Sequence, residues 1–220
     1  MIETLKSVLH SQGKIIEMRN IMTKTQYNLW FGGLLLYSMF LFGLYGYLGV
    51  GSENISVYME TLKETRFEMA KFIFLIGKVM AGFLYPLLFM LFFTVLFWIV
   101  FEEMTFKRVW KLQLIPFIIM LIAKSLDLIL LLILRIPEHS SPLGLGVIAQ
   151  LITPQIFWVE VASNITVFVL LAAYLQFVIL HKSLHLSKRR VIIAVLASWM
   201  LYILLEGTTD TLLRVMKVMI

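Results

Sequence analysis

The amino-acid sequence predicts an all-α fold: a polytopic membrane protein with five transmembrane helices and additional interfacial amphipathic helices. Of its 220 residues, 60% are hydrophobic and the mean hydropathy is +0.92, whereas soluble domains contain roughly 45 to 50% apolar residues. Charged residues make up only 15% of the chain. They gather between apolar runs of about twenty residues, the length that crosses a bilayer. An ordinary soluble enzyme is therefore excluded.

Five apolar runs are the expected spans: residues 29–50, 71–101, 112–134, 156–180 and 191–205. The second has about 30 residues and would measure about 45 Å as a helix, longer than a hydrocarbon core of about 30 Å. It must therefore tilt, project or bend at Pro86. The fourth follows Thr153 and Pro154, an expected N-cap and first helical position. The fifth is short, so Arg189, Arg190 and Glu206 are expected to snorkel at its ends.

Amphipathic segments flank and connect these spans. We expect residues 1–28 to form a basic amphipathic segment on the cytoplasmic membrane surface, and residues 55–67 to form a helix leading into the second span. Ser141 and Pro142 are expected to open a short helix that runs to Ile152. A separate amphipathic helix over 207–220 is expected after Gly207. The membrane domain proper is thus residues 29–206.

The basic residues predict the orientation. If the N-terminus is cytoplasmic, the inner segments carry eleven Lys and Arg residues and the outer segments six. The positive-inside rule therefore favours an N-terminus inside and a C-terminus outside. The formal net charge of +6 is explained by this bias, and no nucleic-acid partner is expected.

Three sequence features resemble the Yip family of five-span, Ypt-interacting membrane proteins, over roughly residues 70 to 206. They are the basic aromatic loop from Thr105 to Val109 followed by Pro116, the Ser141–Gly146 turn, and Ser187–Arg190 before the fifth span. Eukaryotic relatives have an acidic cytosolic N-terminal region, whereas this N-terminus is short and basic. The resemblance therefore implies a bacterial member. Such members look like scaffolds or accessory subunits, some associated with ABC-type exporters that remove toxic peptides.

Ionisable groups at membrane depth are functional candidates because burying a charge in lipid is costly. The candidates here, together with one amide, are Lys78, Lys124, Asp127, Arg135, Glu160, Asn164 and Glu206. One interpretation is that they neutralise one another and fix helix packing; Lys124 and Asp127 share a helix face. A second is that Arg135, Glu160 and Asn164 line an outward-facing pocket for a ligand or peptide. A third is that they form a helix face that meets a partner protein.

Gly43, Gly46 and Gly49 recur every third residue in the first span and leave a narrow strip without side chains. Such a strip permits close approach of another helix. It either seats another span of the same chain or forms a docking surface for another subunit.

Other site types find little support. The chain has no cysteine and no phosphate-binding glycine-rich loop, so thiolate chemistry is excluded and self-energised transport is not expected. His181 and His185 are four residues apart, but no third metal ligand follows and basic residues surround them. No catalytic residues, metal or cofactor are therefore expected. Gln176 is expected to hydrogen-bond between helices.

Three functions follow. The first is a non-enzymatic integral membrane scaffold or accessory subunit, with membrane lipids, another membrane protein such as an exporter subunit, or a second copy of the chain as partners. The second is a small transporter or lipid-handling protein that uses the polar residues of the outer half. The third is an intramembrane enzyme that pairs Asp127 with Glu160, but the sequence contains no signature of such enzymes.

Overall fold

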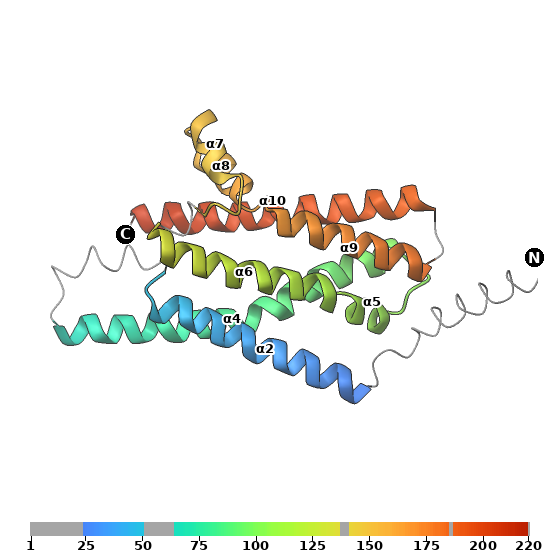
Figure 1. Ribbon diagram of the computed structural model, residues 1–220, viewed down its shortest axis with the longest axis horizontal. Coiled ribbons are helices and arrows are strands. Elements are labelled where there is room, and N and C mark those ends of the chain that lie inside the picture. Colours follow the sequence, from blue (N-terminus) through green and yellow to red (C-terminus); the bar gives the residue numbers. More distant parts are fainter. Residues whose placement is uncertain (1–23, 51–63, 137–140, 185–186, 220) are drawn as a thin grey trace, which may run out of the picture. The chain divides into compact units, whose positions relative to one another are not determined.

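The computed structural model describes residues 24–50, 64–136, 141–184 and 187–219, and all of its regular elements are helices. They are α2 (Lys24–Tyr47), α4 (Glu64–Val100), α5 (Phe106–Leu112), α6 (Leu114–Leu134), α7 (Gly146–Ile152), α8 (Ile156–Ser163), α9 (Val167–Leu184) and α10 (Lys188–Met219) (Figure 1). The chain divides into two compact units, with the boundary inside α2 between Leu34 and Leu35. The second unit contains the helical bundle.

Within the described ranges, four helical segments are long and apolar enough to cross a membrane: Gln26–Tyr47, Phe67–Val100, Phe106–Leu134 and Lys188–Leu212. Val167–Ser183 is apolar but shorter. These segments correspond to the first, second, third and fifth expected spans, and to the second half of the fourth. Helix α4 runs through Pro86 without ending, and Pro116 lies in the first turn of α6, where its missing N–H is tolerated.

The prediction of a single helix over 156–180 is wrong, because the chain breaks between α8 and α9. Side chains compete with the helical backbone there: Ser163 Oγ and Asn164 Nδ2 donate to the Glu160 carbonyl at 2.7 and 3.1 Å. Thr166 then caps the next helix, since its Oγ1 accepts the Val169 N–H at 3.1 Å. Helices α7 and α8 form a hairpin, and α9 starts afresh.

The prediction of a separate helix after Gly207 is also wrong, because α10 continues through this glycine to Met219. Thr208, Thr209 and Thr211 do not cap a new helix. Their hydroxyls donate to carbonyls three or four residues earlier in α10, at 2.6 to 2.7 Å. Gly207 instead serves packing: a Cβ there would lie 2.9 Å from Val161 Cα of α8.

Two other predicted segments are only partly described. The amphipathic segment 1–28 lies outside the described residues as far as residue 23, and the helix over 55–67 does so as far as residue 63. The short helix expected from Ser141 begins later, at Gly146. The turn before it is held by hydrogen bonds from Leu145 N to the Ala162 and Ile165 carbonyls.

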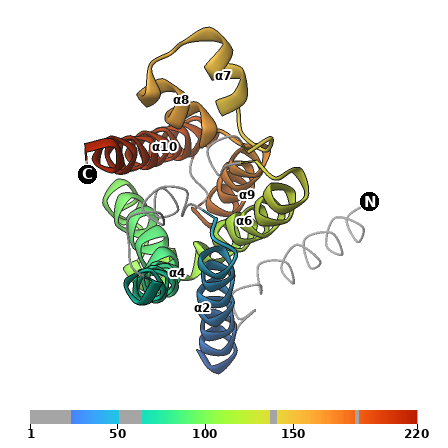
Figure 2. The ribbon, with the colours of Figure 1, turned by 90° about the vertical axis from the view of Figure 1, so that its left-hand side faces the viewer.

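Helices α4, α6, α9 and α10 run alongside one another in the second unit, and the α7–α8 hairpin lies against α10 (Figures 1 and 2). The core between α4, α6 and α10 is aromatic. Phe93 and Trp199 have ring centroids 4.7 Å apart, and Phe89 lies 5.7 Å from Phe117 and 5.4 Å from Tyr202. These rings pack in tilted and edge-to-face arrangements, which favour one fixed interface between the helices.

Candidate functional site

The glycine strip of α2 is covered by α4. A Cβ at Gly43 would lie 3.3 Å from Val79 Cγ2, and one at Gly46 would lie 3.1 Å from Lys78 Cβ. On the α4 side, a Cβ at Gly82 would lie 2.7 Å from the Ser38 carbonyl oxygen. Small residues on both helices thus allow their backbones to approach closely. Gly49 has a different role: it follows the end of α2 with φ 72°, a conformation that glycine adopts readily.

Next to this crossing lies the Tyr45 cluster, which we define as Tyr45, Lys78, Lys124, Asp127 and Ser141. The Tyr45 hydroxyl donates to the Lys124 carbonyl at 2.9 Å and towards Asp127 Oδ2 at 3.5 Å. Ser141 Oγ donates to the other carboxylate oxygen of Asp127. The Lys78 ammonium lies 5.9 Å from the centroid of the Tyr45 ring. Helices α2, α4 and α6 thereby contribute to one partly buried polar cluster.

Glu206 of α10 faces the same region of the bundle. Its carboxylate accepts a hydrogen bond from Tyr202 one turn earlier. Tyr202 and Glu206 both belong to α10, so this bond lies within one helix. The neutralisation of opposite charges at membrane depth stays a prediction.

A second polar contact joins the end of α8 to α10. Asn164 Nδ2 donates to Asp210 Oδ2 at 3.0 Å, and Glu160, which is 6% exposed, lies one turn before it. Asn164 and Glu160 are thus close together at the end of α8. Arg135 is exposed at the end of α6 with φ 53°, and it makes no ion pair within the described part of the chain.

A fully buried polar triad connects the other end of the bundle. Gln176 of α9 donates from Nε2 to Gln113 Oε1 at 2.5 Å, and Trp199 of α10 donates from Nε1 to Gln176 Oε1 at 2.6 Å. None of the three side chains is more than 3% exposed. The prediction that Gln176 hydrogen-bonds between helices is confirmed, and the triad ties together α9, α10 and the α5–α6 junction.

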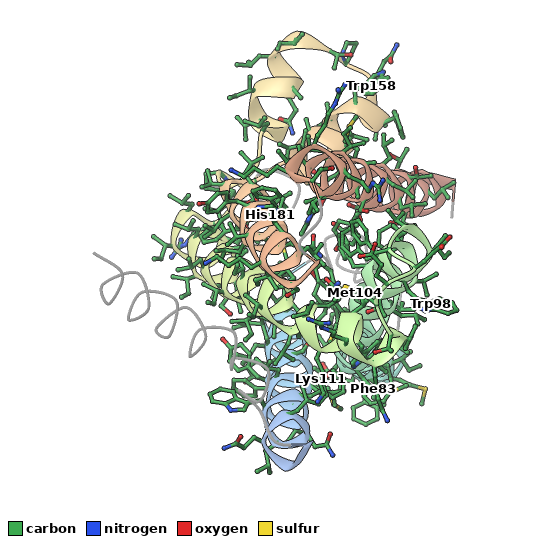
Figure 3. The ribbon with its side chains drawn as sticks, turned by 90° about the vertical axis from the view of Figure 1, so that its right-hand side faces the viewer. Phe83, Trp98, Met104, Lys111, Trp158 and His181 are labelled. Atoms are coloured by element: carbon green, nitrogen blue, oxygen red, sulfur yellow. The ribbon has the colours of Figure 1, made fainter. Side chains whose placement is uncertain are left out.

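Basic residues gather near this end. Helix α5 carries Lys107, Arg108 and Lys111, and Arg108 Nη2 donates to the Ser183 carbonyl at 3.2 Å. This bond holds α5 against the end of α9. Figure 3 labels Lys111 of α5 and His181 of α9. His181 stacks on Phe177 at 5.7 Å, whereas His185 lies outside the described residues. The described residues contain no group of three or more side chains placed to hold a metal ion.

Several partners in these clusters were not among the sequence candidates, notably Tyr45, Ser141, Tyr202 and Asp210. These residues are hard to identify from the sequence, because each is a common polar or aromatic residue whose partner is distant in the chain. Tyr45 and Asp127, for example, are 82 positions apart. The break before α9 had a readable signal. Ser163, Asn164 and Thr166 are residue types that favour helix ends.

Several of these polar side chains join different helices of the chain. A shallow, open depression of about 320 Å³ on the surface of α2 is lined by Leu29, Trp30, Gly33 and Leu34. Comparisons with known proteins add no assignment: no family model, curated protein or solved structure matches the chain.

Proposed function

We propose that this protein is a non-enzymatic integral membrane scaffold or accessory subunit that assembles with, or regulates, another membrane complex. One observation supports the proposal: polar side chains at membrane depth bind groups of the same chain. Asp127 binds Tyr45 and Ser141, and Asn164 binds Asp210, whereas Glu206 binds Tyr202 of its own helix. Groups used in this way stabilise helix packing. The Yip resemblance adds the class of complex, an ABC-type exporter of toxic peptides in a bacterial cytoplasmic membrane.

The proposal includes five membrane crossings, with the N-terminus inside and the C-terminus outside. Helices α6 and α10 run in the same direction, so the chain must return along the bundle between them, and α9 provides that return (Figure 1). Its 18 residues measure about 27 Å as a helix. That length is close to a hydrocarbon core of about 30 Å.

We assign the partner contact to the exposed side of α2. The glycine strip at Gly43 and Gly46 is occupied by α4, so a second protein cannot use it without displacing that helix. Leu36, Phe40 and Tyr47 are 66%, 62% and 79% exposed. Their spacing of four and seven residues places them along one side of the helix.

Purification of the tagged, full-length protein in mild detergent tests the proposal. We expect an exporter subunit with an ATP-binding cassette to co-purify stoichiometrically, and a Leu36→Ala, Phe40→Ala double variant to lose it. A matched control changes Ile193 and Leu196 of α10, which are 57% and 55% exposed, to Ala and should retain the partner. A partner-free monomer would contradict the proposal.

A transporter or lipid-handling protein is the second candidate, favoured by the broken helix. Discontinuous helices with polar groups at the break form substrate sites in many transporters, and Glu160 and Asn164 lie at such a break. A partner-free monomer that carries a stoichiometric lipid or small molecule, identified by native mass spectrometry, would favour this function instead.

A further inference from the structure

We infer that the α7–α8 hairpin lies in the plane of the membrane, embedded in the lipid of the leaflet at the C-terminal end of α10. The partner of this surface is therefore the lipid bilayer itself. The inference goes beyond the proposed function and requires only that the long apolar helices cross a membrane.

Composition and exposure provide the first argument. Residues 141–159 contain no charged side chain, yet the large apolar residues of the hairpin are poorly covered. Leu151 is 86% exposed, Ile152 79%, Ile148 55% and Trp158 52%. Trp158 lies in the hairpin, apart from the bundle core (Figure 3). Contiguous apolar exposure of this kind marks a surface that is covered by lipid or protein.

Length and backbone geometry exclude a transmembrane path. Helices α7 and α8 have seven and eight residues, or about 10 and 12 Å, far short of a hydrocarbon core of about 30 Å. The turn between them is not helical, and Thr153 Oγ1 accepts the Gln155 N–H at 3.2 Å. Non-helical backbone cannot face the lipid core because its polar groups would lack partners. The turn must therefore reach headgroups or water.

The position at which the hairpin is attached to α10 indicates its depth in the membrane. The hairpin is fixed to α10 where Val161 meets Gly207 and where Asn164 binds Asp210. Gly207 follows Arg190 by 17 residues of α10, or about 25 Å. If Arg190 marks one surface of a hydrocarbon core of about 30 Å, Gly207 lies just inside the opposite surface. The hairpin projects sideways from α10 at this level (Figures 1 and 2).

Lipid is favoured over a second protein because α10, to which the hairpin is attached, also exposes large apolar side chains. Leu196, Met200 and Leu204 of α10 are 55%, 65% and 39% exposed on a helix long enough to cross the membrane. Amphipathic elements that lie in the interface insert their apolar side chains among acyl chains and leave polar groups at headgroup level. Leu151 and the polar Thr153–Gln155 turn fit these two positions.

Fluorescence quenching in vesicles of phosphatidylcholine and phosphatidylglycerol tests the inference. The chain has no native cysteine, so Leu151→Cys can be labelled alone with an environment-sensitive dye. Met200→Cys serves as the lipid control and Glu103→Cys, in the exposed loop before α5, as the aqueous control. We expect iodide to quench the dye at position 151 less than the dye at position 103. Nitroxides at the headgroup end of the acyl chain should quench it more than nitroxides at the methyl end.

Three results would overturn the inference. Iodide quenching equal to that at position 103 would place the hairpin in water. Stronger quenching by deep nitroxides, as at position 200, would place it inside the hydrocarbon core. Protection from both quenchers, with disulfide cross-linking of unlabelled Leu151→Cys between copies, would show that a second copy covers it. Repeating the measurement with Gly207→Leu, which should displace α8 from α10, should change the quenching at position 151 but not at position 200.

Discussion

The buried hydrogen bonds between Gln113, Gln176 and Trp199 are the most specific interactions in the bundle, because each side chain comes from a different segment. Leucine at position 176 would leave the Trp199 N–H without its acceptor and would also remove the donor to Gln113. A buried group left without its partner costs about 1 to 3 kcal/mol.

We therefore predict that Gln176→Leu lowers the free energy of unfolding in detergent by about 1 to 3 kcal/mol. Tyr174→Leu, at an exposed position of the same helix, is the control and should leave stability nearly unchanged. Pairing Gln176→Leu with Trp199→Phe in a double-mutant cycle measures the bond itself, and strictly additive effects would show that it contributes nothing.

Asp127 has two hydroxyl donors, Ser141 and Tyr45, on its two carboxylate oxygens. An Asn at this position keeps only one acceptor oxygen, and its amide group would face a second donor. We predict that Asp127→Asn lowers stability by about 1 kcal/mol, the usual scale for polar contacts between membrane helices, and reduces the yield of folded protein. Glu103→Gln, in an exposed loop, is the control. Normal folding combined with lost activity would instead support a ligand pocket.

At the level of helices, the crossing of α2 and α4 depends on glycines. Leucine at Gly46 or Gly82 would force the helices apart, because a Cβ at either position already meets backbone or side-chain atoms at 2.7 to 3.1 Å. Overpacking of this kind typically costs about 1 to 3 kcal/mol.

We predict lower melting temperatures and lower yields for Gly46→Leu and Gly82→Leu. Gly33→Leu is a matched control in α2, since a Cβ there meets nothing within 4 Å. If Gly46→Leu is as stable as Gly33→Leu, the packing role of the glycine strip is wrong. If it is stable and also loses its partner, the strip is a docking surface.

Hydropathy predicted the long helices well, because length and apolar composition alone determine whether a segment can cross a bilayer. It failed at the fourth span. An apolar average over 156–180 conceals three polar residues whose side chains end one helix and begin the next. At Gly207 the sequence predicted a helix end that does not exist, because glycine often ends a helix. Here the glycine lies within α10 and leaves space for Val161 of α8.

For the whole molecule, the direction of the chain across the membrane can be tested directly. In the proposed topology the basic residues Lys107, Arg108 and Lys111 of α5 and Lys188, Arg189 and Arg190 of α10 are cytoplasmic. Each Lys or Arg beside anionic lipid contributes on the order of 1 kcal/mol of attraction. Single cysteines and impermeant thiol reagents should therefore report residues 103 and 188 inside.

Neutralising Lys188, Arg189 and Arg190 together should weaken retention of this loop. We predict that α10 then misinserts in part of the population, so that impermeant reagents label a cysteine in that loop from outside. The same change at Lys63, Arg66 and Lys71 is a control on the opposite side and should not expose the 182–190 loop. Unchanged labelling after the first substitution would contradict the proposed orientation.

Only part of the candidate polar site could be predicted from the sequence. The charged residues at membrane depth could be identified one at a time because lipid makes them costly. Their partners could not, since Tyr45, Ser141 and Asp210 reach them only once the chain has folded. Contacts between residues that are distant in the chain leave no regular spacing in the sequence.

Gly82 and Pro86 of α4 stand four residues apart. Because proline has no N–H, the Gly82 carbonyl lacks the usual donor from the next turn, and α4 is most easily bent at this point. The Ser38 carbonyl of α2 lies beside Gly82 at the same level. A change in the angle of α2 would thus act on α4 at the turn where one backbone hydrogen bond is already missing.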